Sequence, residues 1–133
     1  MRVLYVDDED DIREVAALSL GLDPDLEVHV CASGIEALEM VEQVMPEIIL
    51  LDVMMPGMDG PETLERLRQN EAVRHIPVVF ITARTQAYEI ERFLSLGAVG
   101  VIAKPFDPLT LAQQVREHLE TSTAPALSQA RAV

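Results

Sequence analysis

The feature that most constrains the fold is an apolar run that ends in a single carboxylate. Residues 48–51 read Ile-Ile-Leu-Leu, with none of the polar alternation of a strand covered on one face only. Such a run predicts a strand buried on both faces of a parallel sheet. Asp52 follows directly, and turn-forming Pro56-Gly57 and Asp59-Gly60 come soon after. Asp52 is therefore expected at the carboxyl end of a central strand, where open α/β sheets bind ligands. Taken alone, an aspartate that caps the next loop explains it equally well.

The rest of the chain alternates between strand patterns and helix patterns. Apolar runs predict five strands, and helical spacing with Gly or Pro near the boundaries predicts five helices. Helices between strands imply parallel βαβ units, so we expect an α/β fold with a doubly wound, five-stranded parallel sheet. The expected strands are 2–6, 26–31, 48–52, 78–82 and 99–103, and the expected helices are 10–20, 34–44, 61–70, 87–96 and 108–120.

Residues 121–133 differ in character from the rest, because they are small, polar and Ala-rich without apolar periodicity. We expect one domain over residues 1–120, followed by a flexible C-terminal tail or a truncated linker at 121–133. The sequence has no apolar run near the ~18–20 residues of a membrane span and no signal-peptide pattern, so a cytoplasmic location is expected. The lone Cys31 agrees with a reducing compartment.

The charge of the chain is strongly negative and partly concentrated. A net charge of -13 argues against direct binding of nucleic acid or of an anionic membrane surface. Residues 7–11 are five consecutive acids. A solvated loop and a helix start, where acids complement the helix dipole, explain residues 9–11. Asp7 and Asp8 need another explanation, because they directly follow the expected strand at 2–6.

Several polar residues stand at expected strand ends, and these ends share one edge of a parallel sheet. We expect Asp7, Asp8, Asp52, Thr82 and Lys104 to converge there. Two carboxylates ~4 Å apart repel by about 4 kcal/mol at an effective dielectric constant near 20. The three acids therefore need counter-charges, which Lys104 and a hard divalent cation such as Mg²⁺ would supply. A carboxylate in that setting is a plausible nucleophile toward a phosphoryl group. Individually, Thr82 reads equally well as a strand end, and Lys104 as a surface cation.

The set of residues resembles that of response-regulator receiver domains, which act in two-component signalling and include the chemotaxis regulator. The resemblance covers residues 1 to about 120, and it implies a flavodoxin-like (βα)5 fold with strand order 2-1-3-4-5. The intervals match too, with 44 positions from Asp8 to Asp52, 30 more to Thr82 and 22 more to Lys104. The matching motifs are Asp7-Asp8, Leu-Leu-Asp-Val-Met-Met-Pro-Gly-Met-Asp-Gly around Asp52, Thr82-Ala83, and Lys104-Pro105-Phe106.

The resemblance implies a phosphoacceptor and a metal site. Asp52 would receive a phosphoryl group from the phosphohistidine of a histidine kinase or phosphotransfer protein. Asp8, Asp52 and the backbone carbonyl of Met54 would ligate Mg²⁺ or Mn²⁺ directly, and Asp7 would act through a metal-bound water. Thr82 would move toward the phosphoryl group and Lys104 would pair with it.

The resemblance also implies a switch. Phosphorylation would change the surface formed by residues 87–120 and so control a downstream protein effector, with the chain a monomer or a phosphorylation-linked dimer. As an enzyme it would catalyse only its own phosphotransfer and slow autodephosphorylation. The Lys104–Pro105 peptide bond is expected to be cis. Val101 departs from the pattern, since many receivers carry Tyr or Phe there. The expected switch and tuning positions are Met54, Ala83, Arg84, Val101 and Pro105.

Two alternatives belong to other functional classes. An aspartate-nucleophile phosphohydrolase also uses Mg²⁺ and a carboxylate on an α/β sheet. Such enzymes usually carry a second acid two residues after the nucleophile, where this chain has Met54, and a cap insertion for which the chain has no room. A purely structural or metal-buffering module would leave Thr82 and Lys104-Pro105 unexplained.

Overall fold

The computed structural model describes the backbone of residues 1–132 and the side chains of residues 1–122. Five parallel strands form one sheet in the order β2-β1-β3-β4-β5, as expected for the doubly wound fold. The elements are β1 (Arg2–Val6), α1 (Asp10–Leu20), β2 (Glu27–Cys31), α2 (Gly34–Val44), β3 (Ile48–Asp52), α3 (Gly60–Gln69), β4 (Val78–Thr82), α4 (Ala87–Ser95), β5 (Gly100–Ala103) and α5 (Leu111–Ala132). No helix among the described residues is both long enough and apolar enough to cross a membrane.

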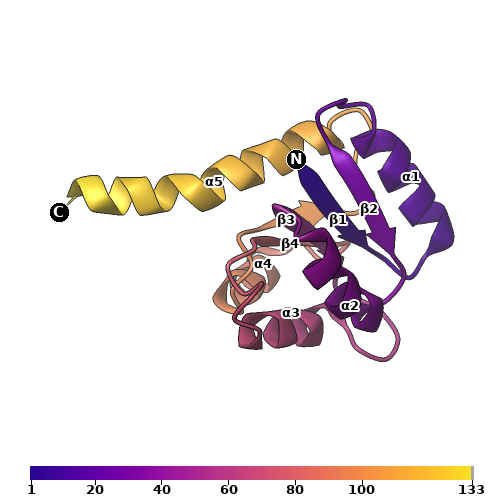
Figure 1. Ribbon diagram of the computed structural model, residues 1–133, viewed down its shortest axis with the longest axis horizontal. Coiled ribbons are helices and arrows are strands. Elements are labelled where there is room, and N and C mark those ends of the chain that lie inside the picture. Colours follow the sequence, from indigo (N-terminus) through magenta and orange to yellow (C-terminus); the bar gives the residue numbers. More distant parts are fainter. Residues whose placement is uncertain (133) are drawn as a thin grey trace.

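Helices cover both faces of the sheet, and this explains the continuous apolar runs. Every residue of β3 and of β4 is buried, because α1 and α5 cover one face while α2, α3 and α4 cover the other (Figure 1). Alternate residues of each strand contribute to the two core layers. Leu50 packs with Leu20 and Val115 on one side, and its neighbour Leu51 packs with Leu64 on the other.

The loop after β3 is folded back tightly onto the strand that carries Asp52. The backbone N–H of Gly60 donates to the carbonyl oxygen of Val53 at 2.9 Å. A Cβ at position 60 would lie 2.6 Å from the carbonyl oxygen of Asp52, so only glycine fits. Asp59 caps α3 by accepting from the N–H of Glu62 at 2.9 Å, and Pro61 stands in the first turn. The turn chemistry seen in the sequence thus fixes the end of β3.

The largest difference from the sequence-based boundaries concerns α5. This helix was expected at 108–120, but it begins at Leu111 and its backbone continues to Ala132. The late start arises because Asp107 holds a turn, in which its side chain accepts from the N–H of Leu109 and its carbonyl oxygen from those of Thr110 and Leu111. The side chains of 123–133 lie outside the described residues, so the division into a domain at 1–120 and a tail at 121–133 stays a prediction. The other boundaries differ by one residue at most.

Candidate functional site

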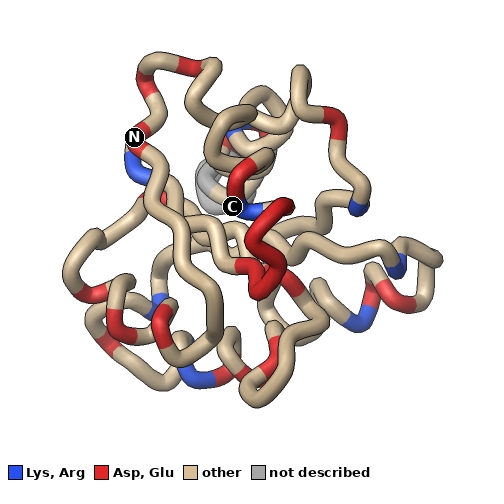
Figure 2. The backbone as a smooth tube through the Cα atoms, turned by 90° about the vertical axis from the view of Figure 1, so that its right-hand side faces the viewer, with Lys and Arg blue, Asp and Glu red and all other residues tan. Residues whose placement is uncertain are grey.

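The polar residues that follow the strands gather at the carboxyl-terminal edge of the sheet. β1 leads into the acidic run 7–11, which is the continuous red segment near the middle of Figure 2. Asp52 is the last residue of β3 and Thr82 is the last residue of β4, while Lys104 directly follows β5. The chain therefore brings together the five residues that the strand ends predicted.

Asp7 is fully buried and its two carboxylate oxygens are both hydrogen-bonded. Its Oδ2 lies 2.9 Å from Nζ of Lys104 and accepts from the hydroxyl of Tyr5 at 3.0 Å. Its Oδ1 accepts from the backbone N–H of Glu9 at 3.0 Å. The Arg13 side chain donates to the carbonyl oxygen of Asp7 at 2.7 Å. Asp7 is therefore held by donors from three segments of the chain.

Asp8, in contrast to Asp7, has a carboxylate oxygen without a hydrogen-bond partner among the described residues. This oxygen is Oδ1, and it is buried. One carboxylate oxygen each from Asp7, Asp8 and Asp52 lies within 4.8 Å of the other two. An orphaned buried carboxylate oxygen is costly, and a hard divalent cation is a partner that this all-oxygen donor set suits. The residues present therefore fit a Mg²⁺ or Mn²⁺ ion and could hold one.

Asp52 is only 4% exposed and stands between charges of both signs. Burial, together with the negative charge of Asp7, raises the pKa of Asp52 from its ordinary value of 3.8 to about 7. Lys104 acts in the opposite direction, with its Nζ 3.6 Å from Oδ1 of Asp52. A second cation at this edge would favour the ionised, nucleophilic form of the Asp52 carboxyl group.

Lys104 lies between the three acids that it could neutralise. Besides Asp7 and Asp52, its Nζ is 3.7 Å from Oε1 of Glu9. Burial by itself lowers the pKa of Lys104, but the hydrogen bond to Asp7 and the charge of Asp52 hold that pKa above its ordinary value. The Lys104–Pro105 peptide bond is cis, as expected. The ammonium group thus stays charged and bridges β1 and β3.

The remaining predicted positions surround this cluster. Thr82 is buried, and its Oγ1 accepts from the backbone N–H of Arg84 at 3.0 Å. Ala83 and the side chain of Arg84 are exposed, Met54 is 64% exposed, and Val101 is half-buried against the α2–α4 side of the core. The positions of these residues are thus known, and the role of each stays a prediction.

Two contacts at this edge were missed by sequence reasoning. The hydroxyl of Tyr5 and the carboxylate of Glu9 both reach the Asp7–Lys104 pair. Tyr5 had a signal that could have been used, since it stands two residues before Asp7 in an extended strand and so shares a face with it. Glu9 had been assigned to a solvated loop and helix start.

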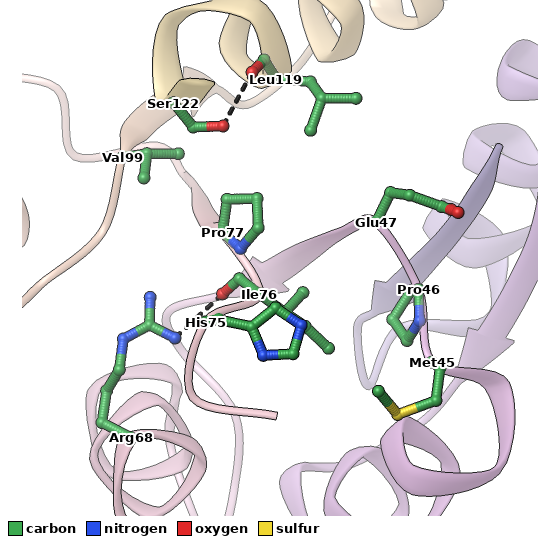
Figure 3. A pocket seen from close by; sticks show the side chains of 10 residues that line it. All are labelled: Met45, Pro46, Glu47, Arg68, His75, Ile76, Pro77, Val99, Leu119 and Ser122. Atoms are coloured by element: carbon green, nitrogen blue, oxygen red, sulfur yellow. Dashed lines mark hydrogen bonds between the residues drawn. The ribbon is translucent and has the colours of Figure 1, made fainter. Parts of the chain in front are cut away.

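The described residues also line a pocket at a different edge of the sheet. It has a volume of about 650 Å³ and lies at the amino-terminal edge of the sheet, away from the acids (Figure 3). Figure 3 shows the Arg68 guanidinium at its wall, bonded to the carbonyl oxygen of Ile76 at 2.9 Å. The lining residues are Met45, Pro46, Glu47, Arg68, His75, Ile76, Pro77, Val99, Leu119 and Ser122. None of the predicted site residues lines it.

Comparison with known proteins agrees with the geometry of the acidic edge. The family model of the response regulator receiver domain matches residues 3–116. The chain belongs to the response-regulator receiver family. Receiver domains are in general signalling domains rather than enzymes, and they work with histidine kinases and effectors.

Curated relatives of this receiver domain are longer proteins. Response regulator Rre1 from Synechocystis is 34% identical over 122 residues, which cover 92% of this chain and 53% of that protein. Transcriptional regulatory protein CseB from Streptomyces coelicolor is 37% identical over 114 residues, covering 86% of this chain and 47% of that protein. The chain thus spans about half the length of these relatives.

Solved structures agree with the fold. The chemotaxis response regulator CheY4 of Vibrio cholerae matches with a TM-score of 0.80 and 32% identity, covering 88% of this chain and 97% of that one. The N-terminal domain of a response regulator receiver protein from Methanoculleus marisnigri matches with a TM-score of 0.71 and 35% identity, covering 92% and 96%.

Proposed function

We propose that this receiver domain accepts a phosphoryl group on Asp52 from the phosphohistidine of a histidine kinase or phosphotransfer protein. The observation that carries the proposal is the setting of Asp52, whose buried carboxylate lies 3.6 Å from Lys104 and within reach of two further acids, one of which has an orphaned oxygen. Ordinary strand-end aspartates do not need such a set of neighbours.

The transfer is a displacement at phosphorus. A carboxylate oxygen of Asp52 forms a bond to phosphorus while the phosphorus–nitrogen bond of the phosphohistidine breaks. The electron pair of that bond leaves with the imidazole nitrogen, and Asp52 becomes an acyl phosphate. Lys104 holds positive charge beside the oxygens of the transferred group, and Thr82 supplies a hydroxyl donor at the end of the neighbouring strand.

Asp8, Asp52 and the Met54 carbonyl are the proposed direct ligands of a Mg²⁺ or Mn²⁺ ion, with Asp7 acting through water. When bound, the ion supplies positive charge that offsets both the carboxylates and the phosphoryl group. The chain's own contribution is to hold one carboxylate oxygen each of Asp7, Asp8 and Asp52 within 4.8 Å of one another.

The signal is proposed to leave through α4, β5 and α5, which form the surface for a downstream protein effector. Phosphorylation adds about -1.5 to -2 charges at the edge that already holds the acids. Thr82 and Lys104 respond, and each is directly continuous with a segment that leads to this surface. Val101 is β-branched and stiff, so we propose that the backbone between Arg84 and Glu89 carries the change in place of an aromatic rotamer.

The activity is proposed to be limited to self-phosphorylation and slow autodephosphorylation, in contrast to a phosphohydrolase. Met54 stands where those enzymes usually carry their second acid, and its side chain is largely exposed. The cytoplasmic location, the absence of direct nucleic-acid binding and the state as monomer or phosphorylation-linked dimer stay predictions of the sequence.

The proposal is tested by labelling with acetyl phosphate or a phosphorylated kinase and by mass spectrometry of the intact chain. We expect one phosphoryl group per chain, on Asp52, only when Mg²⁺ or Mn²⁺ is present, and none in Asp52→Asn. Asp59→Asn is a matched control, because Asp59 lies in the same loop but only caps α3. Equal labelling of wild type and Asp52→Asn would refute the assignment.

A further inference from the structure

Tyr5 places a hydroxyl group in the interior of the molecule, directly beneath the acidic edge. The residue is fully buried in β1, with Val30 and Leu50 as its neighbours across the sheet. A buried phenol needs a hydrogen-bond partner, and the Tyr5 hydroxyl donates to Oδ2 of Asp7 at 3.0 Å. The contact connects the core to the site.

The same oxygen of Asp7 also contacts Lys104, whose Nζ is 2.9 Å away. Oδ2 therefore has two donors, one charged and one neutral. The charged donor is the ammonium group of Lys104 and the neutral donor is the phenol of Tyr5. Lys104 has a second acid within reach, since its Nζ is 3.6 Å from Oδ1 of Asp52.

The ring of Tyr5 is itself fixed. It makes an edge contact with Phe106, with ring centroids 6.4 Å apart and planes at 70°. Phe106 follows Lys104-Pro105, so Tyr5 contacts the segment that carries the lysine as well as the acid that the lysine neutralises. Tyr5 therefore contacts Asp7 through its hydroxyl and the segment that carries Lys104 through its ring.

We infer that Tyr5 is a positioning residue that keeps Asp7 hydrogen-bonded when Lys104 leaves it for a phosphoryl group on Asp52. This inference rests on the proposed phosphorylation of Asp52. Lys104 is the charged donor on this fully buried carboxylate, and the cost of removing its charge opposes the departure of the lysine. The Tyr5 hydroxyl remains on Oδ2 and reduces that resistance, so it favours the phosphorylated arrangement.

The test compares Tyr5→Phe with wild type in two titrations followed by NMR. One uses Mg²⁺ alone, and the other uses beryllium fluoride, a phosphoryl mimic, at saturating Mg²⁺. We expect about tenfold weaker affinity for beryllium fluoride, because in the variant no donor remains on Oδ2 of Asp7 once Lys104 has left, so the missing hydrogen bond costs more in the bound state than in the free state. The affinity for Mg²⁺ should change less than twofold, since the Tyr5 hydroxyl is bonded to Asp7, which is not one of the proposed direct ligands. Ser19→Ala removes another buried hydroxyl, which bonds only within α1, and should change neither affinity.

An Asp7→Asn background separates positioning from a general structural role. With the charge of residue 7 removed, the departure of Lys104 leaves no bare carboxylate, and Tyr5→Phe should then have almost no effect on beryllium fluoride affinity. An equal loss in both backgrounds, or no loss in either, would overturn the role of Tyr5. If wild type itself fails to bind beryllium fluoride, the proposed phosphorylation falls and this inference falls with it.

A second measurement does not depend on the folding of the variant. The chain contains two tyrosines, Tyr5 and Tyr88, so incorporation of 3-fluorotyrosine gives two fluorine resonances. When beryllium fluoride binds to wild type with Mg²⁺, the resonance of Tyr5 should shift, because Lys104 leaves the shared oxygen. A Tyr5 resonance that stays in place at saturation would contradict the inference.

Discussion

Charged side chains have different neighbours at the two edges of the sheet. At the carboxyl-terminal edge, Asp7, Asp8 and Asp52 crowd together with Lys104 as the cation that bridges two of them. At the amino-terminal edge, Arg68 donates to the carbonyl oxygens of Arg74, Ile76 and Gly97 at 3.1, 2.9 and 3.2 Å. One edge holds like charges that oppose folding, whereas the other uses a single charge to join three segments.

This difference indicates how a small domain tolerates a destabilising reactive site at one edge, because bonds at the other edge stabilise the fold. Crowded carboxylates lower the free energy of unfolding unless a cation joins them, and the pKa of Asp52, raised by burial and by Asp7, reports that cost. The bonds of Arg68 tie the loops before β4 and β5 to α3, at the edge where no chemistry is proposed. We expect the two edges to respond to mutation with opposite signs.

The largest effect is expected at the amino-terminal edge. Arg68→Met should lower the free energy of unfolding by about 3 kcal/mol, because three carbonyl oxygens lose a charged donor. Denaturant unfolding with urea measures the change. Arg66→Met is the matched control, since Arg66 is exposed on the same helix and its ion pair, with Glu62 at 3.7 Å, is a contact worth less than about 0.5 kcal/mol. Similar losses in the two variants would remove the contrast between the edges.

A change of opposite sign is expected at the carboxyl-terminal edge. The folded-state pKa of Asp52, about 7, lies above its ordinary 3.8, so the folded state binds the proton more tightly. Wild type should therefore lose stability as the pH rises from about 4 to about 7, whereas Asp52→Asn should not. At pH 8 without divalent ions, Asp52→Asn should be more stable than wild type by at least about 2 kcal/mol.

Thermal and urea unfolding at pH 4 and pH 8 measure this gain, which should vanish at pH 4. Asp11→Asn is the control, because Asp11 is exposed in the same acidic region and its loss should change stability little at either pH. Saturating Mg²⁺ should abolish or reverse the gain, since it stabilises wild type selectively. A variant less stable than wild type at pH 8 without metal would show that the edge carries no electrostatic cost.

The smallest expected effect is a difference in Mg²⁺ affinity between variants of the adjacent residues Asp7 and Asp8 at the carboxyl-terminal edge. Asp8→Asn should weaken Mg²⁺ binding about tenfold more than Asp7→Asn, because Oδ1 of Asp8 lacks a partner while both oxygens of Asp7 are already bonded. Isothermal titration calorimetry measures both affinities. The reverse order would mean that Asp7 gives up its internal bonds to bind the ion directly.

The sequence by itself determined the architecture and indicated which residues lie at the candidate site. Continuous apolar runs at residues 48–51 and 78–81 require cover on both faces, and helices between strands require parallel connections. Parallel strands then bring all their carboxyl ends to one edge, so Asp7, Asp8, Asp52, Thr82 and Lys104 could be placed together without coordinates. These rules depend only on local sequence patterns and on the order of the elements, so they can be applied to a single sequence.

The tertiary structure decided how the members of the site are paired. Adjacent acids in the sequence have different partners, because Asp7 points to Tyr5 and Lys104 while an oxygen of Asp8 is left bare. The late start of α5 at Leu111 has a local cause instead, since Asp107 bonds the turn that follows it. Hydrogen bonds between residues far apart in the chain depend on ångström-scale packing of side chains, which hydrophobic periodicity does not encode.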